Sequence, residues 1–181
     1  QGFRPLCLGK TENGYVLSSE SCAFDAIKAE FIRHIDPGEM VIIDDSGVRS
    51  TIYAESEKID KKLCVFEYIY FARGDSHIDG QSVYQSRLNM GRELYNETKY
   101  DADIVMSIPD SGTTAALGYA RASGIPFAEG LVKNRYSGRT FIKPNQEERE
   151  LAVRMKLNAL PHIVGGKRIV LIDDSIVRGT T

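Results

Sequence analysis

The chain has 181 residues, of which 42% are hydrophobic and 27% are charged, so it can bury the core of one medium domain or of parts of two. Its 23 lysines and arginines against 25 aspartates and glutamates give a formal net charge of −2, without the basic stripe of a nucleic-acid-binding protein. The longest apolar runs, such as VFEYIYFA, are far shorter than the roughly 18 residues of a membrane span. We therefore expect neither a nucleic-acid partner nor a membrane anchor.

The three cysteines, Cys7, Cys22 and Cys64, are too few and too scattered for a disulfide framework, which favours a reducing cytoplasm. A small buried apolar side chain is the simplest interpretation of each. The chain starts at Gln1 rather than at a methionine and stops at Thr181 inside a Gly-Thr-Thr turn. We therefore expect it to be an internal part of a longer protein.

Residues 21–35, SCAFDAIKAEFIRHI, have the spacing of an amphipathic helix. Ser21 is a suitable N-cap, and Phe24, Ile27, Phe31 and Ile35 recur at helical intervals. Pro37-Gly38 follows after Asp36, which predicts the end of the helix.

A β-hairpin is predicted next, from the runs EMVII and VRSTIY joined by Asp44-Asp45-Ser46-Gly47. Asp and Gly are the residues that a tight reversal selects. We expect the carboxylates of Asp44 and Asp45 to lie in water at the tip of this hairpin, as parts of a structural turn.

Beyond ESEKIDKK, a charged stretch that suits a linker, predicted strands alternate with predicted helices. The strands are LCVFEYIYFA, ADIVMSIP, IPFAEGLVKN and KRIVLID, and the helices are SVYQSRLNMGRELYNE, TTAALGYARAS and NQEERELAVRMKLNAL. This alternation, with nearly continuous apolar strands, predicts an α/β fold whose parallel sheet is covered on both faces.

Ligands of such sheets bind beyond the carboxyl ends of the strands, which here are followed by PDSGTT, KNRYSGRTF and DDSIVRGTT. In the last of these, Asp173 and Asp174 precede a loop rich in amides and hydroxyls where a helix should begin. Such a loop suits phosphate, and neighbouring carboxylates suit sugar hydroxyls or Mg²⁺. The pattern therefore predicts a site for a sugar phosphate with Mg²⁺.

DDSIVRGTT resembles the binding signature for 5-phosphoribosyl-1-pyrophosphate (PRPP) in type I phosphoribosyltransferases. The resemblance gives Asp173 and Asp174 the ribose and Mg²⁺ role. It assigns the 5-phosphate to a loop formed by Ser175, Arg178, Gly179, Thr180 and Thr181.

Four further stretches resemble the glutamine PRPP amidotransferase family, so that the likeness covers essentially all 181 residues. They are SESCAFDAIKAEFIRHIDPGE, FEYIYFAR, KNRYSGRTFI and RMKLNA. The resemblance implies that residues 1–55 are the tail of an N-terminal-nucleophile glutaminase domain and residues 56–181 the first part of a phosphoribosyltransferase domain. The implied activity transfers ammonia from glutamine to PRPP, giving 5-phosphoribosylamine, pyrophosphate and glutamate, the first step of purine synthesis.

The same resemblance assigns roles to two further loops. PDSGTT is similar to the loop that holds pyrophosphate, with Ser111 near the metal, and KNRYSGRTF is similar to a mobile lid. In the lid, Lys133 and Tyr136 are the expected catalytic residues and Arg135 and Arg139 the expected substrate contacts. Purine nucleotides as feedback inhibitors and a homo-oligomer are also implied.

The chain departs from the family pattern at Gly74, where proline is usual and where glycine loosens the turn. Cys64 precedes FEYIYFAR, the place of one [4Fe-4S] ligand in the members that bind a cluster, but core packing explains it equally well. The glutaminase nucleophile, an N-terminal cysteine, is missing, and so is the helix after Thr181. We therefore expect these 181 residues alone to be inactive.

Two alternatives share the PRPP signature. A nucleobase phosphoribosyltransferase has no use for residues 1–55. A non-enzymatic PRPP-sensing regulator would need a basic DNA-binding module, which the net charge of −2 does not favour.

Overall fold

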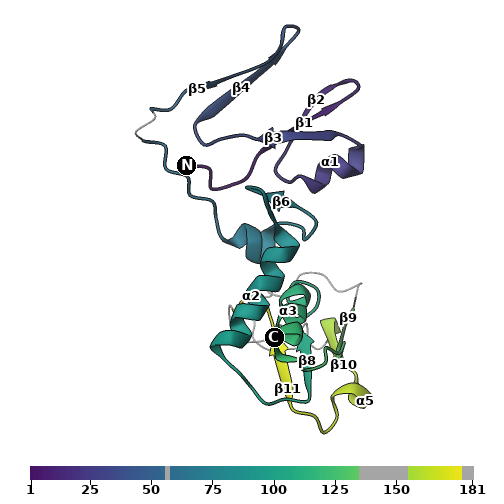
Figure 1. The fold of residues 1–181 in the computed structure, drawn as a ribbon. Helices are drawn as coiled ribbons and strands as arrows, with labels where there is room; N and C mark the ends of the chain where they lie inside the picture. Colours follow the sequence, from purple (N-terminus) through teal and green to yellow (C-terminus); the bar gives the residue numbers. More distant parts are fainter. Residues whose placement is uncertain (56–57, 135–154, 177–181) are drawn as a thin grey trace. The chain divides into compact units, whose positions relative to one another are not determined.

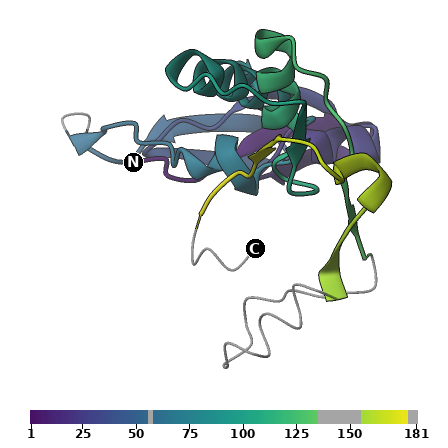
Figure 2. The ribbon, with the colours of Figure 1, turned by 90° about the horizontal axis from the view of Figure 1, so that it is seen from below.

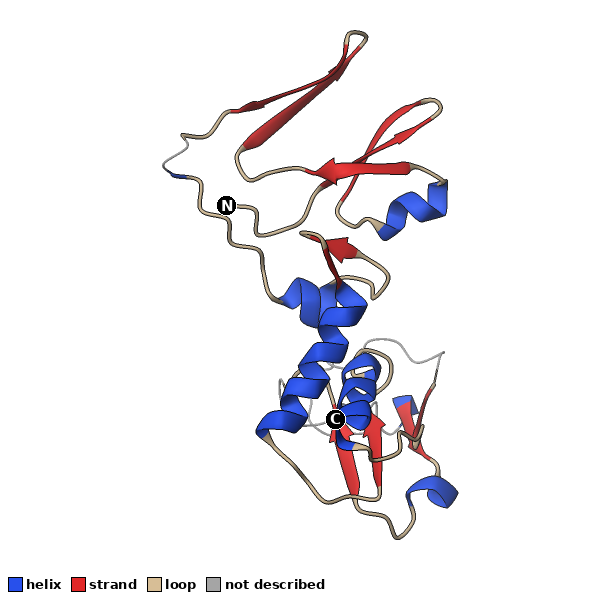
Figure 3. Ribbon diagram, viewed as in Figure 1, coloured by secondary structure: helices blue, strands red, loops and turns tan. Residues whose placement is uncertain are grey.

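The computed structural model describes residues 1–55, 58–134 and 155–176 and has a mixed α/β architecture (Figures 1 and 3). Contacts divide the chain into two compact units, Gln1–Ser86 and Arg87–Thr181. The division lies within helix α2 (Val83–Glu97), about 30 residues after the predicted functional boundary between residues 55 and 56. Within the described residues, no helix is long and apolar enough to cross a membrane.

The first unit begins with an antiparallel sheet in the order β2-β1-β3, formed by β1 (Cys7–Thr11), β2 (Gly14–Ser18) and β3 (Glu30–His34). Helix α1 is short (Cys22–Ile27) and ends where Lys28 adopts a left-handed conformation with φ of 54°. The prediction of one helix through Ile35 is therefore wrong in its second half. Pairing of Glu30–His34 with β1 outweighed the helical spacing of its apolar residues.

The predicted hairpin is confirmed as β4 (Glu39–Asp44) and β5 (Gly47–Ile52). Asp44 pairs with Gly47, so Asp45 and Ser46 form a two-residue turn. Gly47 has a φ of 111°, a conformation that favours glycine.

The stretch LCVFEYIYFA, predicted as a strand, contains a helical turn instead. Element η2 (Glu67–Phe71) is a π-helix, closed by the Ala72 N–H, which donates to the Glu67 carbonyl at 3.1 Å. Its buried Glu67 accepts a hydrogen bond from Arg4 at 2.5 Å, and the Tyr68 hydroxyl donates to the Ile78 carbonyl at 2.9 Å. A continuous apolar run does not distinguish a strand from a buried helix, and these side-chain partners favoured the helix.

After η2, the short strands β6 (His77–Ile78) and β7 (Gln81–Ser82) form a small hairpin that leads directly into α2. The α2 prediction is confirmed.

The second unit is built on two parallel strands, β8 (Ile104–Ser107) and β11 (Ile169–Ile172), which confirms the predicted parallel pairing. Phe127 forms an isolated parallel bridge with Val105 of β8. Helix α3 (Thr113–Ser123) packs against both strands (Figure 1). Their core consists of Val105, Ala116, Tyr119, Ala120, Val170 and Ile172.

Within this unit, helices α2 and α3 lie side by side (Figure 2) and approach closely at two glycines. A Cβ atom added at Gly91 would lie 1.8 Å from the Ala115 carbonyl oxygen, and one at Gly118 would lie 2.1 Å from that of Leu88. No side chain fits at either position, so this contact fixes how α3 packs on α2.

Strands β9 (Leu131–Lys133) and β10 (Leu157–Ala159) pair antiparallel, and α5 (Pro161–Val164) follows. The strand predicted for IPFAEGLVKN is therefore confirmed only over its last part and at the Phe127 bridge. The helix predicted for residues 145–160 is wrong at Leu157–Ala159, because these residues pair with β9. Residues 145–154 lie outside the described part of the chain.

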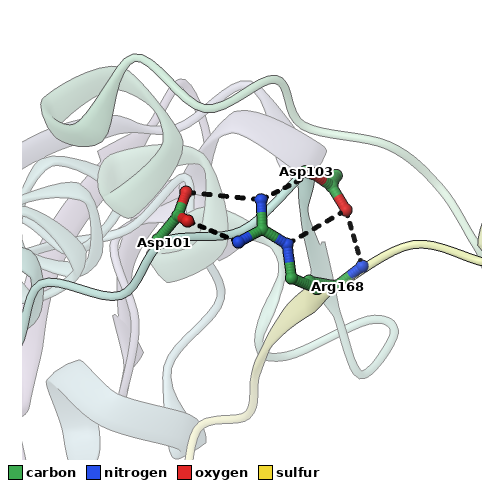
Figure 4. Close-up of polar contacts among 3 residues, drawn as sticks. All are labelled: Asp101, Asp103 and Arg168. Carbon is green, nitrogen blue, oxygen red and sulfur yellow. Dashed lines mark hydrogen bonds and ion pairs between the residues drawn. The ribbon is translucent and has the colours of Figure 1, made fainter.

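The amino ends of β8 and β11 are joined by one arginine (Figure 4). The Arg168 backbone N–H donates to Asp103 Oδ2 at 2.8 Å, and its guanidinium donates to Asp103 Oδ1 at 2.9 Å and also to Asp101. Hydrogen bonds from Arg168 lower the pKa of Asp103. This cluster fixes the register of the parallel pair at the end away from the predicted ligand loops.

Candidate active site

At their carboxyl ends, β8 and β11 bring two predicted loops into contact. The Ile108 N–H donates to the Ile172 carbonyl at 2.9 Å. A Cβ atom added at Gly112 would lie 2.7 Å from that same carbonyl oxygen and 3.1 Å from the Asp173 Cα. PDSGTT therefore lies directly against the start of DDS, and glycine is required at position 112.

The acidic pair lies at this edge, half-buried. Asp173 accepts a hydrogen bond from the Asp174 backbone N–H at 2.9 Å, and the Ser175 hydroxyl donates to Asp174 at 2.6 Å. Burial has the largest effect and raises the pKa of Asp173. The hydrogen bond from the Asp174 N–H and the charge of Lys156 lower it, and the charge of Asp174 raises it. A partly desolvated carboxylate with a like-charged neighbour is stabilised by a cation or by hydroxyl donors.

The PDSGTT loop lies between the end of β8 and the start of α3. Its Ser111 is half-buried, and the peptide bond between Pro109 and Asp110 is cis. The hydroxyls of Ser107 and Thr113 lie 3.1 Å apart, which ties the last residue of β8 to the first turn of the helix. The amino-terminal amides of α3 therefore begin beside the acidic pair, in an arrangement that favours an anion.

Lys133, the last residue of β9, also reaches this edge. Its Nζ lies 2.6 Å from Asp110 Oδ2, so the ammonium group sits beside the PDSGTT loop. Ser111, Lys133, Asp173, Asp174 and Ser175, all predicted site residues, therefore belong to one edge of the second unit. Sequence analysis did not single out Asp110 or Gly112, although both lie within the PDSGTT loop that it predicted.

The remaining predicted site residues of this unit lie outside the described residues. They are Arg135, Tyr136, Arg139, Arg178, Gly179, Thr180 and Thr181.

Cys64 belongs to the first unit, where it is half-buried, and its backbone N–H donates to the Phe3 carbonyl at 3.1 Å. In residues 1–55, 58–134 and 155–176, no three or more His, Cys, Asp or Glu side chains gather as a metal site. The described residues therefore provide no thiolate set that fits an iron–sulfur cluster, whereas the oxygen donors of Asp173 and Asp174 fit Mg²⁺.

The chain is similar over nearly its whole length to known enzymes. It is 56% identical over 180 residues to the amidophosphoribosyltransferase of Archaeoglobus fulgidus and 52% identical to that of Bacillus subtilis, covering 99% of this chain in both cases. It spans 39% and 37% of the length of these relatives. No protein-family model matches the chain.

Solved structures give the same result. The glutamine PRPP amidotransferase of B. subtilis, complexed with ADP and GMP, superposes with a TM-score of 0.88 at 52% identity, covering 99% of this chain and 39% of that one. A structure of the allosteric regulatory enzyme of purine biosynthesis superposes with a TM-score of 0.89, also at 52% identity. Along 99% of its length, this chain is therefore homologous to one segment of the amidophosphoribosyltransferases.

Proposed function

We propose that the protein carrying this chain is an amidophosphoribosyltransferase, which transfers ammonia from glutamine to PRPP and forms 5-phosphoribosylamine, pyrophosphate and glutamate. One observation carries the proposal. Asp173-Asp174-Ser175, the PDSGTT loop and Lys133 lie together at the carboxyl ends of β8 and β11. Identities of 51–56% to amidophosphoribosyltransferases support it, and they favour it over a nucleobase phosphoribosyltransferase.

In the proposed reaction, pyrophosphate leaves the ribose and positive charge develops on the sugar ring, so catalysis depends mainly on electrostatic stabilisation. Asp173 and Asp174 accept from the ribose hydroxyls and stabilise that charge. Ser111 and the amides at the start of α3 hold pyrophosphate, and the Lys133 ammonium neutralises part of its charge as it leaves. Ser175 holds Asp174 in place through the 2.6 Å hydrogen bond.

Asp173 and Asp174, with Ser111, would hold a Mg²⁺ ion, which neutralises pyrophosphate charge when it is bound. Arg178, Gly179, Thr180 and Thr181 complete the proposed phosphate loop, and Arg135, Tyr136 and Arg139 the proposed lid. A [4Fe-4S] role for Cys64 has no support among the described residues, and the proposal includes no step that uses it.

The proposal keeps residues 1–55 as the C-terminal part of the glutaminase domain and residues 56–181 as the N-terminal part of the phosphoribosyltransferase domain. It includes purine nucleotides as inhibitors, since the B. subtilis structure is a complex with ADP and GMP, and it includes assembly into a homo-oligomer. Three free cysteines suit a reducing cytoplasm.

The proposal is tested by incubating the full-length protein with PRPP, glutamine and Mg²⁺ and measuring the pyrophosphate and glutamate that it forms. We expect pyrophosphate and glutamate to appear in equal amounts, and ammonium salts to replace glutamine. Replacing glutamine and ammonia by adenine, guanine or hypoxanthine should stop pyrophosphate release. Release that depends on a nucleobase and not on ammonia would refute the proposal.

A further inference from the structure

Glu20 is the centre of a hydrogen-bonded clamp within the first unit. Its Oε2 atom accepts from the Arg73 backbone N–H at 2.7 Å and from the Ser76 hydroxyl at 2.8 Å, and the Cys22 thiol lies 3.8 Å away. The next residue extends the clamp, because the Ser21 hydroxyl oxygen accepts from the His77 N–H at 2.8 Å. One carboxylate and one hydroxyl just before α1 thus hold a segment more than 50 residues later in the chain.

The clamped segment is a tight turn. The Ser76 N–H donates to the Arg73 carbonyl at 3.0 Å, and Ser76 is completely buried. Gly74 is the second residue of this turn, where the conformation does not require glycine: its φ is not positive, and an added Cβ would meet nothing within 4 Å. Because glycine orders a turn poorly, the bonds to Glu20 provide order that the backbone at Gly74 does not.

The turn is in direct contact with the start of α2. The Val83 N–H donates to the Ser76 carbonyl at 3.0 Å, and the Tyr84 N–H donates to the Gly74 carbonyl at 3.0 Å. Further along α2, Gly91 packs on the backbone of α3, and α3 starts at the PDSGTT loop of the candidate active site. The turn thus sets the first residues of the helix that supports this loop.

We propose that Glu20 is a positioning residue that couples the two proposed half-reactions, by fixing the Arg73–Ser76 turn to the segment that enters α1. The inference rests on the proposed function, in which Glu20 belongs to the glutaminase part and the turn to the transferase part. Hydrogen-bond networks and rigid helices carry coupling between sites, and the clamp, the Arg73–Ser76 turn and α2 form such a chain. Glu20 binds Arg73 and Ser76, which have no role in the proposed transfer reaction, so its removal should spare the chemistry of the transferase.

The test compares glutamine-dependent with ammonia-dependent formation of 5-phosphoribosylamine in the full-length protein. For Glu20→Ala we expect the ratio of the two activities to fall by about tenfold, within the usual range of coupling energies. Ammonia-dependent turnover should stay within about twofold of wild type. Glu20→Gln keeps an acceptor oxygen and should restore most of the ratio. Glu12→Ala, at an exposed hairpin turn of the same unit, is the matched control and should leave the ratio unchanged.

Two further variants keep the test decisive. Ser76→Ala removes a single hydroxyl and should lower the ratio in the same direction by about two- to threefold, even if Glu20→Ala does not fold. Gly74→Pro stiffens the same turn and should restore part of the ratio in a Glu20→Ala background.

A ratio unchanged by Ser76→Ala, or an equal loss of both activities in a folded Glu20→Ala protein, would overturn the coupling role. A wild-type protein that forms no 5-phosphoribosylamine from either nitrogen source would instead contradict the proposed function.

Discussion

The chain contains the sequence Asp-Asp-Ser twice, and its two copies lie in opposite environments. Residues 44–46 form an exposed hairpin tip, where Asp44 accepts hydrogen bonds from the Ser46 N–H at 2.9 Å, from its hydroxyl and from Arg49. Residues 173–175 are half-buried at the end of a parallel strand, where they lie against the PDSGTT loop. The first copy is satisfied by its own turn. In the second copy, the partly desolvated carboxylate of Asp173 lies beside the charge of Asp174. Perturbed carboxylates of this kind are typical of binding sites rather than of turns.

The largest expected difference concerns the second aspartate of each copy. In the full-length protein, Asp174→Asn should lower ammonia-dependent turnover at least about tenfold, or ~1.4 kcal/mol of transition-state stabilisation. Asp45→Asn, at the hairpin tip, should leave it near wild type. Steady-state kinetics with saturating Mg²⁺ measure both, and equal losses would remove the distinction between the copies.

A glycine lies beside each copy, and substituting it sharpens the comparison. Gly47 follows the first copy in the sequence, and Gly112 lies against the start of the second copy in space. Gly112→Ala places a Cβ 2.7 Å from the Ile172 carbonyl oxygen, so it should displace the acidic segment and lower the free energy of unfolding by about 1–3 kcal/mol. We expect KM for PRPP to rise together with this loss. Gly47→Ala meets no atom within 4 Å and is strained only by its φ of 111°, so it should cost about 1 kcal/mol of stability with no change in KM. An unchanged KM in Gly112→Ala would mean that the loop contact does not shape the site.

The serines should give a smaller contrast. Ser175→Ala removes the hydrogen bond that orients Asp174 and should weaken Mg-PRPP binding by about 0.5–1.5 kcal/mol in isothermal titration calorimetry. Ser46→Ala removes the hydroxyl that donates to Asp44 at the hairpin tip and should not alter binding. Loss of affinity in Ser46→Ala would contradict a purely structural turn.

The smallest contrast is in the pH dependence of stability, where the first aspartates should differ in sign. Hydrogen bonds from Ser46, then from Arg49, lower the pKa of Asp44 from 3.8, so its stabilising contribution is present above 3.8 and is lost as pH falls through the lowered pKa. Burial raises the pKa of Asp173 above 3.8, so its contribution is full below 3.8 and is lost as pH rises through the raised pKa.

Denaturant unfolding of the ligand-free protein between about pH 3 and pH 7 tests this difference. Asp44→Asn should reduce stability at the neutral end, and Asp173→Asn should increase it there. Shifts of the same sign in both variants would contradict the contrast in burial.

The distinction between the two copies was predictable from sequence, because it depends on the residues directly after each Asp-Asp-Ser. A return to alternating β-residues marked the hairpin, and a hydroxyl-rich loop after an apolar strand marked the site. Helices α2 and α3 and strands β8 and β11 were predicted for similar local reasons. It was also predictable that Asp173 and Ser111 lie at the same edge of the sheet, because ligand-binding loops follow the carboxyl ends of parallel strands.

Other features depend on partners that are distant in the sequence. Glu30–His34 has helical spacing but pairs with β1, and Glu67 enters a helical turn in which it binds Arg4. The contact of Lys133 with Asp110 and the fit of Gly112 against Ile172 arise only when separate strands meet. Local patterns carry no information about such contacts, so these elements and residues required the structure.

The cluster of Arg168 with Asp101 and Asp103 has a consequence for synthesis of the chain. Its bond to Asp103 joins residues 65 positions apart, so at a translation rate of about 5–20 residues per second β8 leaves the ribosome roughly 3–13 s before β11. During that interval the apolar segment Ile104–Ser107 has no β11 partner. We expect the charges of Asp101 and Asp103, just before this segment, to oppose its association with other nascent chains. On this expectation, the same acidic residues that later fix the strand register first protect the unfinished sheet from aggregation.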